Sequence, residues 1–220
     1  MNLPLDIREA ADVAAITQLI LKERQSRDLG LWDDMRVCFH PDSRVRVSWF
    51  RGSGEDFVLG SIDMAARVVN RHRLSPIQVT LSGRRAIATL SAIVDIPARL
   101  GETEMNLSIY SRFVYRTEKR EERWRIFGFD AIYLRDELTP AIPGCSISID
   151  PKELKSFRPS YRLLSYVLSR HGYTIAADLP GEDQPETVRA LMDEIYSWAG
   201  MKGSLSEVTA SSSRKVVLSA

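Results

Sequence analysis

Hydrophobic residues recur at helical spacing in the first third of the chain. One helix is predicted over residues 10–29, with Glu23, Arg24 and Gln25 on its solvent side and an apolar side made by Val13, Ile16, Leu19, Ile20 and Leu21. A shorter helix is expected over 31–38, because His40 precedes Pro41 and such a residue resists helical geometry. A third is predicted over 60–72, which places His72 at a helix end.

Polar and apolar residues alternate after His72, which is the period of a β-strand. Strands are predicted at 77–81, 86–96, 105–115 and 124–134, after an earlier one at 45–50. The turns between them fall at Ser82–Gly83, at Pro97–Gly101 and at a charged hairpin tip, Lys119–Glu122. Short turns join antiparallel strands. The predicted fold class is therefore α+β, with helices first and then a curved antiparallel sheet of about four to six strands.

The chain changes character beyond Pro140, where Pro143 and Gly144 interrupt the strand pattern. Two amphipathic helices are predicted over 161–170 and 186–198. We expect residues 141–200 to form a helical extension packed on the domain of residues 1–140, since it is too short to bury its own apolar side chains. The serine-rich residues 201–220 are expected to be disordered.

Composition argues against several kinds of partner. Thirty basic and 29 acidic residues give a net charge of +1, so no global field favours nucleic acid or an anionic membrane. No apolar run approaches the ~20 residues of a membrane span, and the first residues do not resemble a signal peptide. Two cysteines, Cys38 and Cys145, are too few for a disulfide framework. A cytoplasmic location is expected.

Neither a metal nor a cofactor is expected. The chain has three histidines without HxH or HExxH spacing, and it lacks a glycine-rich phosphate loop. His40, in a turn before a proline, and His171, at a helix end, are interpreted as structural. Any chemistry must then come from the remaining side chains.

Asp28 and His72 are the strongest candidates for catalysis. Asp28 lies at the end of the first predicted helix and His72 at the end of the third, and both are expected to reach the same apolar hollow. A carboxylic acid and an imidazole together are sufficient for proton-transfer chemistry. Burial lowers the pKa of an imidazole, whereas a neighbouring carboxylate raises it and fixes the tautomer. The alternative is structural, because a histidine near a helix C-terminus is itself favourable.

Several aromatic and charged residues are candidates for substrate binding. Trp32 and Trp49 either pack in the core or line a pocket for an apolar, aromatic substrate. Tyr110, Tyr115 and Tyr133 lie on predicted strands, where at least one hydroxyl is expected to point inward as a donor. Arg27, next to Asp28, is either a surface charge or part of the site.

The order of elements resembles the nuclear transport factor 2-like superfamily, in particular its SnoaL-like enzymes. The resemblance covers residues 10–140 and rests on Arg27-Asp28-x-x-x-Trp32-Asp33, Phe39-x-Pro41-Asp42, His72 followed by Val79-x-x-x-Gly83-x-x-Ala86, and Trp124-Arg125-Ile126. It implies a cone-shaped fold in which the sheet and helices enclose an apolar pocket, and a homo-oligomer (dimer or trimer). Relatives include dehydratases, isomerases, dehydrochlorinases, cyclases and non-catalytic binding modules, so fold alone does not decide function.

The resemblance also implies roles for single residues. Asp28 and His72 match the Asp–His dyad of the family's dehydratases and dehydrochlorinases. Asp95 lies near a second carboxylate of some bile-acid dehydratases. Phe129 and Asp130 lie near a position where several relatives carry an arginine, so this chain departs from the pattern there. These two residues, with Tyr133, are expected to contact the substrate.

The function predicted from these features is a cofactor-independent lyase acting on a hydrophobic small molecule. His72, oriented by Asp28, removes a proton, while Tyr110 or a protonated Asp95 assists the leaving group. The chain length, the helical extension, Trp32 and Trp49 resemble bacterial lyases of aromatic compound catabolism that release formaldehyde from lignin-derived diarylpropane diols. The alternatives are a non-catalytic binding or assembly module, and a ketosteroid-type isomerase built on Asp95 and Tyr110.

Overall fold

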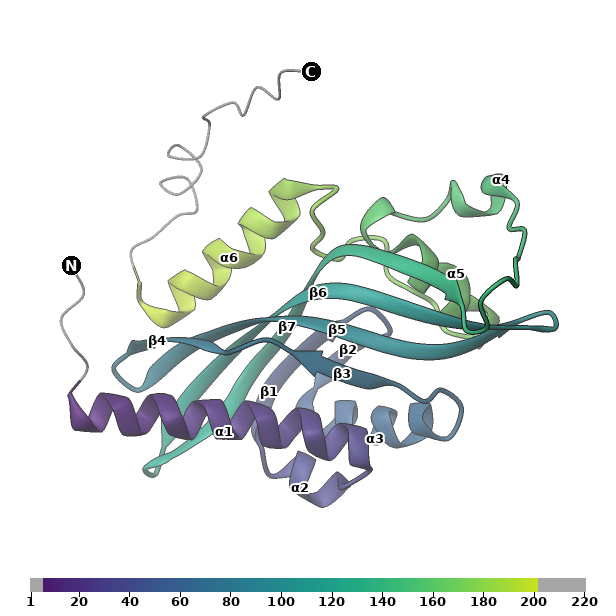
Figure 1. The fold of residues 1–220 in the computed structure, drawn as a ribbon. Helices are drawn as coiled ribbons and strands as arrows, with labels where there is room; N and C mark the ends of the chain where they lie inside the picture. Colours follow the sequence, from purple (N-terminus) through teal and green to yellow (C-terminus); the bar gives the residue numbers. More distant parts are fainter. Residues whose placement is uncertain (1–5, 202–220) are drawn as a thin grey trace.

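A computed structural model describes residues 6–201 and confirms the α+β class (Figure 1). The helices are α1 (Ile7–Leu29), α2 (Trp32–Arg36), α3 (Gly54–Ala65), α4 (Pro151–Leu154), the 3₁₀ turn η1 (Pro159–Tyr161), α5 (Arg162–Arg170) and α6 (Pro185–Ala199). The strands are β1 (Phe39–Val47), β2 (Phe50–Ser53), β3 (Arg71–Leu74), β4 (Gln78–Ser82), β5 (Arg85–Leu100), β6 (Thr103–Arg120) and β7 (Arg123–Pro140). None of the helices within this range has the length and apolarity of a membrane span. The segment expected to be disordered lies, beyond Met201, outside the described residues.

The sheet differs from the prediction in two respects. It has seven strands instead of four to six, in the order β2-β1-β7-β6-β5-β3 with β4 also paired to β5. The sheet is curved, as predicted, and open. It is also mixed, because β1 pairs with β7 in parallel. The expectation of a purely antiparallel sheet was wrong at this point. Short turns govern only strands that are neighbours in sequence, and β1 and β7 are far apart along the chain.

Helix α1 sets the position of Asp28. Asp6 and Glu9 form a capping box at its start, and Gly30, with φ 73°, ends it in the left-handed conformation that suits glycine. The predicted solvent side of this helix is wrong in part. Glu23 and Arg24 are buried, and only Gln25 of the three is exposed. The two buried charges pair with each other, which is how a protein tolerates such groups in its interior.

Helix α3 begins and ends earlier than the predicted span of 60–72. The Ser53 hydroxyl accepts from the Asp56 amide at 3.1 Å, so Ser53 is the N-cap of a helix with acidic residues in its first turn. The helix ends at Ala65, before the β-branched pair Val68 and Val69. His72 therefore lies on strand β3 and not at a helix end.

Strand β5 continues through Pro97, where a turn was expected. Pro97 pairs with Asn106 of β6, but the pairing of β5 with β3 stops at Asp95. This part of β5 thus has one neighbouring strand, and a proline is tolerated where its missing N–H is not needed by a second one.

The two faces of the sheet pack against different helices (Figure 1). Tyr115 and Phe129 point to the concave face and belong to the main core, which also contains Ile16 and Ile20 of α1. The outward positions bury a second cluster against α6, made by Ile87, Val114, Ile132, Leu191, Met192, Ile195 and Ala199. This arrangement follows from strand alternation, since neighbouring residues of β7 serve opposite faces. Part of the outer face is thus covered by α6.

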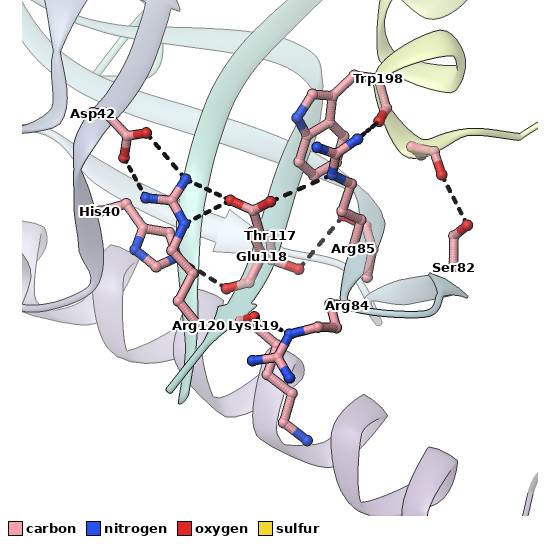
Figure 2. Close-up of polar contacts among 12 residues, drawn as sticks. His40, Asp42, Ser82, Arg84, Arg85, Thr117, Glu118, Lys119, Arg120 and Trp198 are labelled. Carbon is pink, nitrogen blue, oxygen red and sulfur yellow. Dashed lines mark hydrogen bonds and ion pairs between the residues drawn. The ribbon is translucent and has the colours of Figure 1, made fainter. Parts of the chain in front are cut away.

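Polar contacts hold the end of α6 against the β4–β5 hairpin (Figure 2). The Ser82 hydroxyl donates to the Ala199 carbonyl at 2.8 Å, and Arg85 donates to the Trp198 carbonyl at 2.5 Å. These bonds satisfy carbonyls that a helix C-terminus leaves free. The tip of the neighbouring β6–β7 hairpin is charge-compensated, because Arg120 pairs with Asp42 and Lys119 with Asp12.

Asp136 of β7 fixes helix α5. Its carboxylate accepts from the Leu164 amide at 2.8 Å, at the start of the helix that supplies Leu164 and Leu168 to the concave side. Burial raises the pKa of Asp136 to about 6, and hydrogen bonds from the Leu164 and Leu163 amides only partly oppose this. The folded protein thus binds a proton here more tightly than the unfolded chain.

We expect this carboxyl group to weaken the fold as pH rises. A raised pKa contributes stability below the unfolded value of 3.8, and that contribution is lost as pH passes through about 6. Relative to Asp136→Asn, the wild type should lose on the order of 3 kcal/mol of unfolding free energy as pH rises from the unfolded pKa of 3.8 through the folded pKa of about 6. Urea unfolding of both proteins across the interval measures it. A constant difference between them would contradict the assignment.

Candidate active site

A largely apolar pocket opens on the concave side, between the sheet, helices α1 and α3, and helix α5. Its walls include the aromatic side chains Trp49, Phe57, Phe113 and Phe129, together with Leu164 and Leu168 of α5. The polar groups that line it are few: Arg24, Arg27, Ser48, Asn70, His72, Ser111 and Tyr133. An apolar cavity with a few polar groups is the usual form of a small-molecule site.

The predicted contact between Asp28 and His72 is confirmed. The Asp28 Oδ1 atom lies 2.6 Å from His72 Nδ1, and the His72 backbone N–H donates to Oδ2 at 2.8 Å. The carboxylate therefore holds both the ring and the backbone of His72. The two side chains are 13% and 6% exposed, so water competes little with this pair. His72 lines the pocket, whereas Asp28 lies behind it.

Arg24 determines how the imidazole is protonated. Its Nη1 lies 3.5 Å from His72 Nε2. A guanidinium can only donate, so Nε2 carries the lone pair and the proton resides on Nδ1, facing Asp28. This tautomer presents a basic nitrogen towards the pocket. The Arg24 guanidinium is itself held by Glu23 and lies over the Phe129 ring, 4.9 Å from its centroid.

The charges around His72 act in opposite directions. Burial lowers the pKa of His72 below its usual 6.5, Arg24 and Arg27 lower it further, and Asp28 only partly restores it. Burial would raise the pKa of Asp28, but its hydrogen bonds with His72 outweigh this and hold it below its usual value. At neutral pH the pair is therefore a neutral imidazole beside a carboxylate, which is the form of a general base.

Tyr133 carries one of the hydroxyl groups that line the pocket, beside those of Ser48 and Ser111. Its oxygen accepts from the Ser48 amide at 2.7 Å, which leaves its own proton to donate. Burial raises the pKa of Tyr133 to about 12, so the hydroxyl keeps this proton at neutral pH. Ser48 belongs to the turn between β1 and β2, which also carries Trp49.

Two candidates for the leaving-group acid lie outside the pocket. Asp95 pairs with Arg73 at 2.6 Å and accepts from Ser108, and these bonds lower its pKa. The Tyr110 hydroxyl donates to Glu137, with Arg135 over its ring. Strand alternation explains both errors, because the pocket is lined by Val94, Ile96, Ile109 and Ser111 and their neighbours face outward. The isomerase alternative thereby loses both of its residues.

Two predicted contact residues are also displaced from the pocket. Trp32 packs beside α1, where the Arg27 guanidinium lies 5.9 Å from its ring centroid. Asp130 is buried on the outer face, between Arg46 and Arg116. Burial raises the pKa of this carboxyl, although both arginines oppose the shift. Arg27, Trp49, Phe129 and Tyr133 do line the pocket.

Sequence reasoning missed Arg24, Asn70 and Ser111. Arg24 lies four residues before Asp28, hence one turn away on the same side of α1, and that spacing was a usable signal. Ser111 lies two residues before the inward-facing Phe113 on β6. Among residues 6–201, no group of three or more His, Cys, Asp or Glu side chains is placed to hold a metal ion.

Comparison with known proteins gives the family. A curved sheet with an N-terminal helix and a buried Asp–His pair is the arrangement that the SnoaL-like resemblance implied. Residues 8–130 match the family model described as SnoaL-like domain, and the chain belongs to this family. The predicted family is thus confirmed, and the match ends before helices α4 to α6.

Curated relatives include two proteins of the fungus Fusarium vanettenii. A PEP2-like protein is 28% identical over 70% of this chain and 69% of its own. Pea pathogenicity protein 2 is 27% identical over 77% of each chain.

Solved structures share the fold at low sequence identity. A putative scytalone dehydratase from Novosphingobium aromaticivorans has a TM-score of 0.51 and 12% identity, covering 63% of this chain and 97% of its own. A hexachlorocyclohexane dehydrochlorinase from Novosphingobium barchaimii has a TM-score of 0.51 and 17% identity, covering 66% of this chain and 99% of its own.

Proposed function

We propose that this protein is a cofactor-independent lyase that eliminates water or formaldehyde from a hydrophobic, aromatic small molecule. The observation that carries the proposal is the buried pair of His72 and Asp28, with the Nε2 lone pair of His72 at the pocket wall. Family membership and the dehydratase and dehydrochlorinase structures of the same fold support this reaction class.

His72 is the base in this proposal. Nε2 takes a proton from a carbon or hydroxyl of the substrate, and Asp28 stabilises the imidazolium that forms. Asp28 acts through His72 and is a positioning residue. The Tyr133 hydroxyl takes the role first given to Tyr110 or Asp95 and donates a proton to the departing oxygen. Arg24, beside Nε2, stabilises negative charge that develops where the proton is removed.

The bonds balance in both forms of the reaction. In a dehydration, the electron pair of the broken C–H bond forms the double bond, and the hydroxyl leaves as water. In a diarylpropane diol, loss of the terminal hydroxyl proton expels formaldehyde, and the electrons of the broken C–C bond form a stilbene as the benzylic hydroxyl leaves as water. The aromatic walls, Trp49, Phe113 and Phe129, suit such a delocalised product.

A substrate screen that measures binding and turnover in parallel tests the proposal. Aromatic alcohols and diarylpropane diols are added to the wild type and to His72→Ala. Ligand binding is followed by the change in tryptophan fluorescence, to which Trp49 in the pocket wall contributes. New double-bond absorbance or formaldehyde with the wild type alone is the expected result. Compounds that bind the wild type throughout the panel without turnover would favour the binding-module alternative. Turnover by His72→Ala equal to that of the wild type would show that His72 is not the base.

A further inference from the structure

Arg27 is a buried cation whose hydrogen-bonding capacity is not used up. The residue is 4% exposed, lines the pocket, and is followed in α1 by Asp28. Within the described residues 6–201, its Nη2 atom is buried and has no hydrogen-bond acceptor. The two nearby carboxylates are engaged elsewhere, Asp28 with His72 and Glu23 with Arg24. An unsatisfied buried donor costs free energy, and the cost is larger for a charged group.

The charges that face the ligand are all positive. Arg24 and Arg27 line the pocket, whereas Glu23 and Asp28 are not among its lining residues. Burial and the charge of Arg24 lower the pKa of Arg27 to about 10, so this guanidinium is still charged at neutral pH. A ligand in the pocket therefore meets two cations directly, with the balancing carboxylates behind them. Such a pocket favours an anionic group on the ligand.

Two neutral polar atoms in the same pocket are also unpartnered within residues 6–201. They are the Ser111 hydroxyl oxygen and the Asn70 side-chain oxygen, both buried. The Ser111 hydroxyl can donate to an oxygen of a ligand, whereas the Asn70 oxygen can only accept, for example from a hydroxyl group of the ligand. The charge balance of the reaction points the same way, because proton transfer to His72 adds a positive charge that an anionic substrate compensates.

We propose that Arg27 is a specificity-determining residue that binds a carboxylate of the substrate. A guanidinium pairs with a carboxylate through two parallel hydrogen bonds, which a neutral amide cannot reproduce. The substrate class of the proposed lyase is then an aromatic carboxylic acid. This inference rests on the proposed function in one respect: it assumes that the molecule whose carboxylate Arg27 binds is the substrate of the lyase.

Binding of simple aromatic acids tests this without any turnover. Benzoate and 3-phenylpropanoate are titrated against the full chain by calorimetry, each beside its neutral carboxamide. The wild type should bind the acids at least ~10-fold more tightly than the amides, because a charge-assisted, two-bond pair is stronger than the hydrogen bonds of a neutral amide. Arg27→Met should abolish this preference. Arg71→Met removes a nearby charge from an exposed residue outside the pocket and should retain it.

Each contrary outcome overturns the inference. Equal affinities for acid and amide, or no binding of either acid by the wild type, would show that water or protein groups satisfy Arg27. If the preference for acids survives Arg27→Met, or if Arg71→Met removes it to the same extent, the preference comes from the overall positive charge of this region and not from a contact with Arg27. If Arg27→Met does not fold, the inference is tested by the wild-type comparison of acid with amide and by Arg27→Lys. The lysine keeps the charge and should keep part of the preference for acids. His72→Ala should lose turnover but keep the preference, so the two proposals fail independently.

Discussion

His72→Ala is expected to lower turnover of the true substrate by a factor of ~10² to 10⁴. The variant removes Nε2 of His72, which is the proposed base, while Asp28 and the pocket walls remain. No other side chain of the lining offers a neutral, basic nitrogen, because Arg24 and Arg27 are cations, and Tyr133 is held protonated. Initial rates under saturating and limiting substrate give the effect on kcat and on kcat/KM.

His40→Ala is the matched control for this loss. His40 is also buried, at 5% exposure, but its ring lies 3.0 Å from the Glu118 carbonyl near the hairpin tip (Figure 2) and is not part of the pocket. This variant should lose stability and keep its turnover. An unchanged rate in His72→Ala, or equal losses in both variants, would refute the role of His72.

Asp28→Asn should do similar but smaller damage. The Asp28 carboxylate accepts both from the ring and from the backbone N–H of His72, whereas an amide oxygen can replace only one of these acceptors. An amide also cannot stabilise the imidazolium. Because the two residues act as a unit, the double variant should be no worse than His72→Ala alone. Multiplicative losses would mean that Asp28 acts on the substrate directly.

Removal of the residues after Pro140 is expected to give an aggregating or unstable product. Helix α6 covers Ile87, Val114 and Ile132, which would become an exposed apolar patch on the outer face. Helix α5 supplies Leu164 and Leu168, so the pocket would lose part of its wall as well. Size-exclusion chromatography and thermal unfolding of the shortened protein measure the effect. A monodisperse fragment with the full-length melting temperature would contradict it.

A pair of isoleucine variants tests the same packing in the full chain. Ile195 of α6 is fully buried, and Ile195→Ala should cost ~2–5 kcal/mol of unfolding free energy. Ile142 is 57% exposed in the segment after β7, and Ile142→Ala should change stability by no more than ~0.5 kcal/mol. Similar small losses in both would show that α6 contributes little.

The local elements of the fold could be predicted because their signals are local. Periodicity identified α1, α5 and α6 to within a few residues, and alternation identified the long strands. The parallel pairing of β1 with β7 could not be predicted in this way, because it depends on where the chain returns after six intervening strands and helices. Helix α3 was misplaced because its N-cap, Ser53, lies between Gly52 and Gly54, and glycines usually interrupt regular structure.

The site could be predicted where the chemistry of two residues required them to be in contact. Asp28 and His72 were paired correctly even though His72 lies on a strand, because β3 brings it to the same end of α1. Asp95 and Tyr110 were wrong because the direction of a strand side chain depends on register, which a single sequence fixes only weakly. Arg24 was missed because a charged residue is usually expected in solvent, and only its contact with Glu23 makes burial acceptable.

The protonation state of the His72 ring tests the central claim most directly and needs no substrate. Nitrogen NMR of the histidine rings, with His72 assigned by the signals that His72→Ala lacks, reports the tautomer and the pKa. The His72 ring is expected to be neutral at neutral pH with its proton on Nδ1, to have a pKa below the usual 6.5, and to have a still lower pKa in Asp28→Asn. A proton on Nε2, or a charged ring at neutral pH, would contradict the claim that His72 is a base held ready by Asp28.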